Sequence, residues 1–294
     1  MMDSGYEIQT QLQINKMYTS FTAYHKNQYT FTGDSHNYWE VMYVISGSVC
    51  ATSNDRVYDL SEGDIIFHEP YELHKYYTTS PNTKYLVYSH DLKGNLADAF
   101  RQKVFSLNNG QKNIVSSLLD YVKKRSAGGN LDHPSGEHET EDDKVEYFTH
   151  IIKDPAYGHG LVLYIYQLML SLAYDGTKAT PSNTYDVVLF SRCVKFMQAN
   201  LSETKTVSDV AKHANISISG LKRIFEKCAG MGVHKYILML KLNAATEFLE
   251  QGYSVSHVAS RLGFSSQAHF SRAYKRELKV SPSEFKHKKQ GTSL

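Results

Sequence analysis

Residues 254–276, SVSHVASRLGFSSQAHFSRAYKR, decide the fold of the C-terminal part of this chain. Apolar side chains recur at helical spacing before Gly263, where the tolerance of glycine for left-handed backbone is expected to end the helix in a sharp turn. Ser265 or Ser266 then offers an N-cap for a second helix. That second helix turns Phe270 and its helical neighbours inward and leaves basic side chains outside. The pattern predicts a helix-turn-helix, in which such a second helix enters the major groove of DNA.

The same pattern occurs earlier in the chain. Residues 207–211 parallel residues 255–259 at an offset of 48, and the helix after each turn repeats at an offset of 49. Between the two units, residues 234–251 predict one long helix. A rigid helix would hold the two units at the spacing of adjacent turns of one DNA groove, about 34 Å.

Charge is divided between the two halves of the chain. From residue 181 onward there are 17 Lys and Arg against 8 Asp and Glu, whereas residues 1–180 hold 15 against 22. An acidic half joined to a basic half indicates that only the C-terminal part meets a polyanion.

Length and composition bound the class of protein. A chain of 294 residues predicts roughly two domains, and an apolar fraction of 41% supports sizeable cores. The three cysteines are widely spaced, which excludes a disulfide framework and favours the reducing cytoplasm. The polar N-terminus predicts no signal peptide. No apolar run approaches the roughly 20 residues that span a bilayer, so no membrane partner is expected.

Short β-rich runs separated by turn residues fill the N-terminal part. They lie at residues 39–45, 49–52, 56–60, 65–67 and 84–89. This spacing predicts a sandwich or barrel. The first 30 residues fit either a flexible arm or a first strand.

Helical patterns follow the strands. They cover residues 111–124, 145–153 and 161–174, with a Gly-rich, then acidic loop expected over 126–143. The last pattern is almost wholly apolar, so we expect it to be buried in the domain or in a dimer interface. The expected organisation is an effector-binding domain over 1–105, a helical dimerisation region over 106–175, a linker over 176–184 and a DNA-binding domain over 185–294.

The two second helices offer hydrogen-bonding side chains on their outward, N-terminal sides. The candidate base-reading residues are Ser219, Lys222 and Arg223 in the first unit, and Gln267, Ala268, His269 and Arg272 in the second. Arg and Lys suit guanine, Gln suits adenine, and Ala packs on a thymine methyl. Solvated faces of an ordinary helical domain are the alternative, but the doubled unit and the charge division favour DNA. Lysines that would instead contact phosphates are Lys212, Lys227, Lys275, Lys286, Lys288 and Lys289.

Residues 262–276, followed by VSPSEF at 280–285, resemble the signature of AraC/XylS-family transcription regulators. The resemblance covers about residues 185–288. It implies a homodimer and base contacts from Ser219, Lys222 and Arg223 in the first unit and from Gln267, His269 and Arg272 in the second, with Ala268 nearby. The expected partners are a double-stranded DNA operator and, as a further candidate, RNA polymerase. Lys241 stands where the family usually has Arg.

The strand region also resembles the cupin-type sensor domain of this family, through His36-x3-Glu40-x6-Gly47, Gly63-Asp64 and Pro70-x3-His74. Alternation places His36, Tyr38 and Glu40 on one face of a strand. If that face lines the barrel, His36, Glu40 and His74 converge.

Three interpretations of this convergence are open: a catalytic metal site, an effector pocket, and polar residues that serve the fold. Asp34 stands where enzymatic cupins usually offer a further His, which counts against catalysis. We favour an effector pocket of His36, Tyr38, Glu40 and His74. The 12 tyrosines among residues 1–90 favour a carbohydrate, because Tyr offers a stacking face and a hydroxyl.

We therefore expect a two-domain α+β protein, with a cupin-like β-barrel and appended helices followed by an all-α double helix-turn-helix. Its expected function is cytoplasmic, sequence-specific transcription regulation under a small-molecule effector. No enzyme activity, cofactor or metal is predicted, although whether the barrel holds a metal stays open. The rival is a metal-dependent cupin enzyme with a helical appendage.

Overall fold

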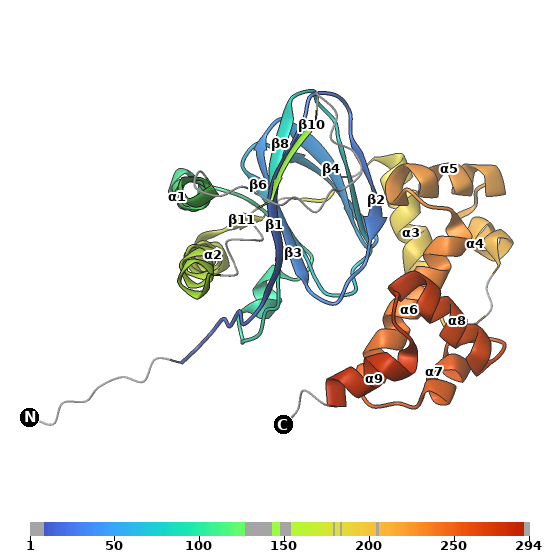
Figure 1. Cartoon of the computed structure of the whole chain (residues 1–294). Coiled ribbons are helices and arrows are strands. Elements are labelled where there is room, and N and C mark those ends of the chain that lie inside the picture. Colours follow the sequence, from blue (N-terminus) through green and yellow to red (C-terminus); the bar gives the residue numbers. More distant parts are fainter. Residues whose placement is uncertain are drawn as a thin grey trace, which may run out of the picture.

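A computed structural model of the chain describes residues 9–126, 143–147, 154–178, 180–182, 184–203 and 206–290. Two β-sheets form the middle of the molecule (Figure 1). Two helices of the N-terminal part lie on one side of the sheets, and the C-terminal helices lie on the other. The predicted fold class, α+β with a β-rich N-terminal part and a helical C-terminal part, is confirmed.

The strands pair antiparallel throughout the described ladders. The larger sheet has the order β10 (Asp143–Tyr147), β1 (Met17–His25), β8 (Thr83–His90), β3 (Trp39–Ser46), β6 (Asp64–His68), β9 (Lys103–Ser106) and β11 (Thr177–Lys178). The smaller sheet has the order β2 (Thr30–Asp34), β7 (His74–Thr78), β4 (Ser48–Ser53) and β5 (Arg56–Ser61). A 3-10 helix, η1 (Ala97–Phe100), precedes β9.

Alternation along β3 divides its side chains between two cores. Val41 and Tyr43 lie in an apolar cluster with the helices α1 (Asn109–Ser126) and α2 (Pro155–Asp175). Met42 and Val44 lie in a second cluster between the two sheets. The face that also carries Glu40 therefore points into the barrel, because side chains two residues apart share a face.

The helix α2 begins after Asp154, whose side chain accepts a hydrogen bond from the backbone N–H of Ala156. One side of α2 buries Leu161, Ile165, Leu168, Met169 and Leu172 against the barrel. The opposite side leaves Leu163, Leu170 and Tyr174 exposed. The helix thus serves the core of the domain and keeps an apolar face uncovered within the described part of the chain.

The expected helix over 145–153 is wrong at its start. Residues 143–147 form β10, which pairs with β1 from Phe21↔Tyr147 to His25↔Asp143. The alternation of charged and apolar residues over this short stretch is compatible with an edge strand, and its pairing with β1 makes it a strand rather than a helix. Residues 148–153, like nearly all of the expected loop over 126–143, lie outside the described residues.

The expected linker is partly tied to the barrel. Within it, β11 pairs with β9, and the Ser182 N–H donates to the Val57 carbonyl at 2.6 Å. Of the first 30 residues, 17–25 are strand β1 rather than an arm.

The C-terminal part is all helical where it is described. Its helices are α3 (Tyr185–Ala199), α4 (Val207–Ala214), α5 (Ile218–Ala229), α6 (Val233–Glu250), α7 (Val255–Arg261), α8 (Gln267–Leu278) and α9 (Pro282–Gln290). Ser217 caps α5, and Ser266 rather than Ser265 caps α8. Gly263 has φ +66° in the turn between α7 and α8, the left-handed backbone that glycine favours.

The barrel and the helical part share a buried boundary. Cys50, Val57 and Leu73 of the barrel lie in one apolar cluster with residues of the C-terminal helices. The Tyr236 hydroxyl on α6 donates to the Asn54 carbonyl at 3.0 Å. Apolar and polar contacts therefore hold the two parts together.

Candidate functional site

The first candidate DNA-reading surface is the outward side of α5. Leu221 and Phe225 are fully buried, which turns Ser219, Lys222 and Arg223 toward solvent. The three lie in the first half of the helix, as in a helix that enters the major groove by its N-terminal end. The structure brings these residues together on one exposed face.

The second candidate surface is the start of α8. Gln267, Ala268, His269 and Arg272 are all exposed, while Phe270 is fully buried. A hydrogen bond of 3.0 Å joins His269 Nδ1 to the Ser265 hydroxyl and orients the imidazole. Both second helices therefore expose their N-terminal halves, with Arg223 and Arg272 at corresponding positions of the two units.

Asp186, at the start of α3, partly neutralises the positive charge of α5. Its carboxylate lies 2.8 Å from Lys227 Nζ and 3.7 Å from the Arg223 guanidinium. A hydrogen bond from Lys227 holds the pKa of Asp186 below its usual range, and the charge of Arg223 adds to this effect. Asp186 thus competes with DNA for two cations of the first surface.

The predicted phosphate-contacting lysines differ in their availability. Lys212 and Lys275 are exposed. Lys286 Nζ donates to the carbonyls of Gly252 and Tyr253 at 2.8 and 3.0 Å, which ties α9 to the segment before α7. The side chains of Lys288 and Lys289 lie outside the described residues.

Lys241, on the long helix α6, lies between the two units. Its ammonium donates to the Leu262 carbonyl at 2.8 Å, at the end of α7. The side chain therefore helps to fix α7 against α6.

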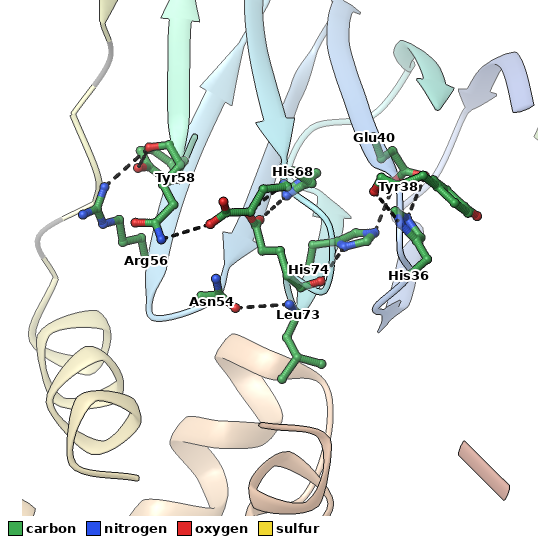
Figure 2. Close-up of polar contacts among 12 residues, drawn as sticks. His36, Tyr38, Glu40, Asn54, Arg56, Tyr58, His68, Leu73 and His74 are labelled. Atoms are coloured by element: carbon green, nitrogen blue, oxygen red, sulfur yellow. Dashed lines mark hydrogen bonds and ion pairs between the residues drawn. The ribbon is translucent and has the colours of Figure 1, made fainter. Parts of the chain in front are cut away.

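The candidate sensor residues meet at one end of the barrel (Figure 2). Glu40 comes from β3, His74 begins β7, and His36 lies between β2 and β3. The Glu40 carboxylate lies 3.5 Å from His36 Nε2 and 3.3 Å from His74 Nε2. Tyr38 stacks on His36 with a ring separation of 3.8 Å. The structure therefore brings all four predicted residues together.

The pair of imidazoles governs the charge of this cluster. Burial opposes ionisation of Glu40, but the nearby imidazoles of His36 and His74 hold its pKa well below the usual range. Burial likewise opposes protonation of His74, yet Glu40 raises the pKa of His74 to about 9. Burial and the charge of Glu40 raise the pKa of Tyr38 to about 12. The cluster therefore favours a carboxylate facing positive charge.

Sequence reasoning missed a second buried pair beside the first. His68 on β6 hydrogen-bonds through Nδ1 to the Glu72 carboxylate, and both side chains are almost fully buried. The His68 ring stacks on His74 at 4.6 Å, and burial lowers the pKa of His68. The spacing His68-x3-Glu72 inside a strand and turn was the available signal.

Three cavities of about 660, 590 and 290 Å³ open elsewhere. The first lies between the barrel, the linker and α3, and includes Asp55 and Lys195. The second lies between the barrel and α6, and includes Tyr71 and Glu247. None of these three is lined by the His36–Glu40–His74 cluster. The two larger ones lie at the boundary between the two parts of the molecule.

Within the described residues, no helix combines the length and the apolar character needed to cross a membrane.

Comparison with known proteins matches both parts of the chain to sequence families. The family described as helix-turn-helix domain matches residues 210–288, and the one described as AraC-like ligand binding domain matches residues 18–120. The "uncharacterized HTH-type transcriptional regulator YfiF" of Bacillus subtilis is 26% identical over 88% of this chain and 80% of its own length. The "HTH-type transcriptional activator RhaR" of Escherichia coli is 22% identical over 88% of each chain. Among solved structures, ToxT from Vibrio cholerae aligns with 95% of this chain and 98% of its own at 12% identity, with a TM-score of 0.39.

Proposed function

The chain belongs to the AraC family of transcriptional regulators, with a ligand-binding and a DNA-binding part, and we propose that it reads its operator with α5 and α8 under control of a small-molecule effector. The doubled helix-turn-helix carries this proposal, because both second helices expose hydrogen-bonding and basic side chains at their N-terminal ends. A regulator of this kind acts on chromosomal DNA, in the cytoplasm of a bacterium, and RNA polymerase is a further proposed partner.

Selection of binding sites from random double-stranded DNA tests the proposal. The full chain should enrich a defined motif. Substitution Arg223→Ala should relax the preference in one part of that motif, and Arg272→Ala in another. Enrichment of no motif would leave the protein without the proposed activity.

We place the effector at the cluster of His36, Tyr38, Glu40 and His74. A carboxylate and two imidazoles suit ligand hydroxyls, so a carbohydrate is the class that these groups favour. A panel of monosaccharides, added one at a time during operator titration, tests this assignment. Glu40→Ala should abolish the response to the active sugar and leave operator binding without sugar unchanged. A normal response in that variant would show that Glu40 does not contact the effector.

Contacts between the barrel and α5 support a route from effector to DNA. Lys75, next to His74, donates from Nζ to the carbonyls of Glu226 and Lys227 at 3.2 and 3.3 Å. The Thr52 hydroxyl donates to the Cys228 carbonyl. The barrel thus caps the C-terminal end of the first DNA-reading helix. An effector that moves β7 would change this cap, provided that it binds the two arrangements with different affinity.

We propose a homodimer formed through α2. Leu163 and Tyr174 are 55% and 73% exposed, and Leu170 lies on the same side of the helix. A second copy of the chain would cover this side without disturbing the side that packs on the barrel. Sedimentation equilibrium should give a dimer for the wild type and a monomer for Leu163→Glu. A wild-type monomer at every concentration would refute this assembly.

A further inference from the structure

Backbone hydrogen bonds fix which nitrogen of each imidazole in the sensor cluster faces Glu40. His36 Nδ1 lies 3.0 Å from the Tyr38 carbonyl, and His74 Nδ1 lies 3.1 Å from the Glu72 carbonyl. A carbonyl oxygen only accepts, so each Nδ1 carries a hydrogen and donates it. Each Nε2 is consequently the atom left to face Glu40.

These two Nε2 atoms are buried, and neither makes a hydrogen bond. Each lies 3.3–3.5 Å from a Glu40 oxygen, and the three ligand atoms fall within 4.8 Å of one another. In a tetrahedral site with bonds of about 2.0–2.1 Å, adjacent ligand atoms lie about 3.3 Å apart. Metal ligation requires both imidazoles to be neutral, and their two Nε2 lone pairs then face the carboxylate with room for a cation between them.

We propose that His36, His74 and Glu40 bind a divalent transition-metal ion. Two imidazole nitrogens and one carboxylate oxygen form a ligand set that suits Zn²⁺ and neighbouring first-row metals. Three protein ligands leave at least one coordination position for water or for an oxygen of the effector.

The surroundings of the ligands are those of a preformed metal site. Both histidines are oriented by Nδ1–H bonds to carbonyls, and the Ser89 hydroxyl donates to Glu40 at 3.2 Å. Tyr38 holds the His36 ring by stacking on it. Outer contacts of this kind fix the tautomer and the direction of the ligand atom.

Other buried histidines of the described residues lack this combination. His90 also has an unpartnered Nε2 and donates from Nδ1 to the Asp91 carbonyl at 2.8 Å, but it belongs to no group of metal-ligating side chains. His68 hydrogen-bonds to Glu72. His90 is therefore a matched control: a buried imidazole with the same tautomer outside the cluster.

The residues next to the ligands contact the DNA-binding part. The Ser35 hydroxyl, next to His36, donates to Asn243 Oδ1 on α6 at 3.1 Å. Lys75, next to His74, donates to the end of α5. An ion that draws His36 and His74 toward Glu40 moves both anchors. This consequence rests on the proposed regulatory function, whereas the metal site itself does not.

Calorimetric titration of the chelator-treated full chain with Zn²⁺ tests the site, and Co²⁺ absorption reports its ligand geometry. The wild type and His90→Leu should each bind one equivalent. His36→Ala and the nearly isosteric Glu40→Gln should lower the affinity by at least about 100-fold and lose the Co²⁺ spectrum. Absence of stoichiometric binding, or unchanged binding in folded Glu40→Gln, would overturn the proposal.

Operator binding by the same samples separates this inference from the proposed function. Zn²⁺ should shift the operator affinity of the wild type and leave that of His36→Ala unchanged. A bound ion without such a shift would refute the coupling and leave the site standing. Specific DNA binding by protein that takes up no metal would refute the metal site and leave the proposed regulator intact.

Discussion

Replacing Lys75 by Met should weaken the contact between the barrel and the C-terminal end of α5. The substitution keeps most of the side-chain volume and removes the ammonium that donates to the Glu226 and Lys227 carbonyls. Hydrogen bonds from charged donors contribute about 1.5–3 kcal/mol each. These two are long, at 3.2 and 3.3 Å, and burial also lowers the pKa of Lys75. We therefore expect a loss of about 1.5–3 kcal/mol for the pair together.

Amide hydrogen exchange over residues 226–229 measures this loss directly. If the last turn of α5 opens locally, a loss of that size speeds exchange there by about 10- to 150-fold. Lys84→Met is the matched control, because Lys84 is an exposed lysine on another barrel strand. Equal exchange rates in the two variants would refute the view that Lys75 holds α5.

Further expectations concern single side chains. Arg272→Ala should cost about 1–3 kcal/mol on the selected operator and flatten the preference at one base position, whereas undiminished discrimination would exclude its base contact. Asp186→Asn should raise DNA affinity about two- to fivefold by releasing Arg223 and Lys227, and an unchanged titration would contradict this. Burial lowers the pKa of His90 to about 4, below the value near 6.5 in the unfolded chain. The contribution of His90 to the free energy of unfolding is therefore complete above pH 6.5 and is lost as the pH falls toward 4. When the free energy of unfolding is measured with urea at a series of pH values, its decrease between pH 6.5 and 4 should be smaller in His90→Leu than in the wild type by about 3 kcal/mol. The same pH dependence in both proteins would contradict this.

Local signals were enough to predict the C-terminal part. Gly263 ends one helix and a serine caps the next, and both effects depend on residues within one turn of the chain. The 48–49-residue repeat added the second unit without any knowledge of tertiary contacts. Exposure of Arg223 and Arg272 followed from helical periodicity alone.

Features that depend on pairing between distant segments were less accessible. The pattern over 143–147 is too short to distinguish a strand from a helix. The stretch becomes a strand because it pairs with β1, which is more than 100 residues away in the chain. Asp34 directed attention away from a metal, while the tautomers that point two lone pairs at Glu40 come from the Tyr38 and Glu72 carbonyls.

The boundary between barrel and helices carried no sequence signal. Lys75 and Glu226 are 151 residues apart, and neither belongs to a motif. Their meeting depends on how Leu73 and its apolar neighbours dock against the C-terminal helices. Such docking is set by the assembled surfaces of two folded parts.

Footprinting of the full chain on its selected operator tests the central claim most directly. Two units on one rigid α6 should protect two major-groove segments, centred about one helical turn or 10 base pairs apart, for each protomer. Arg223→Ala should weaken protection of one segment, and Arg272→Ala that of the other. A single protected segment, or protection that does not depend on sequence, would contradict the account.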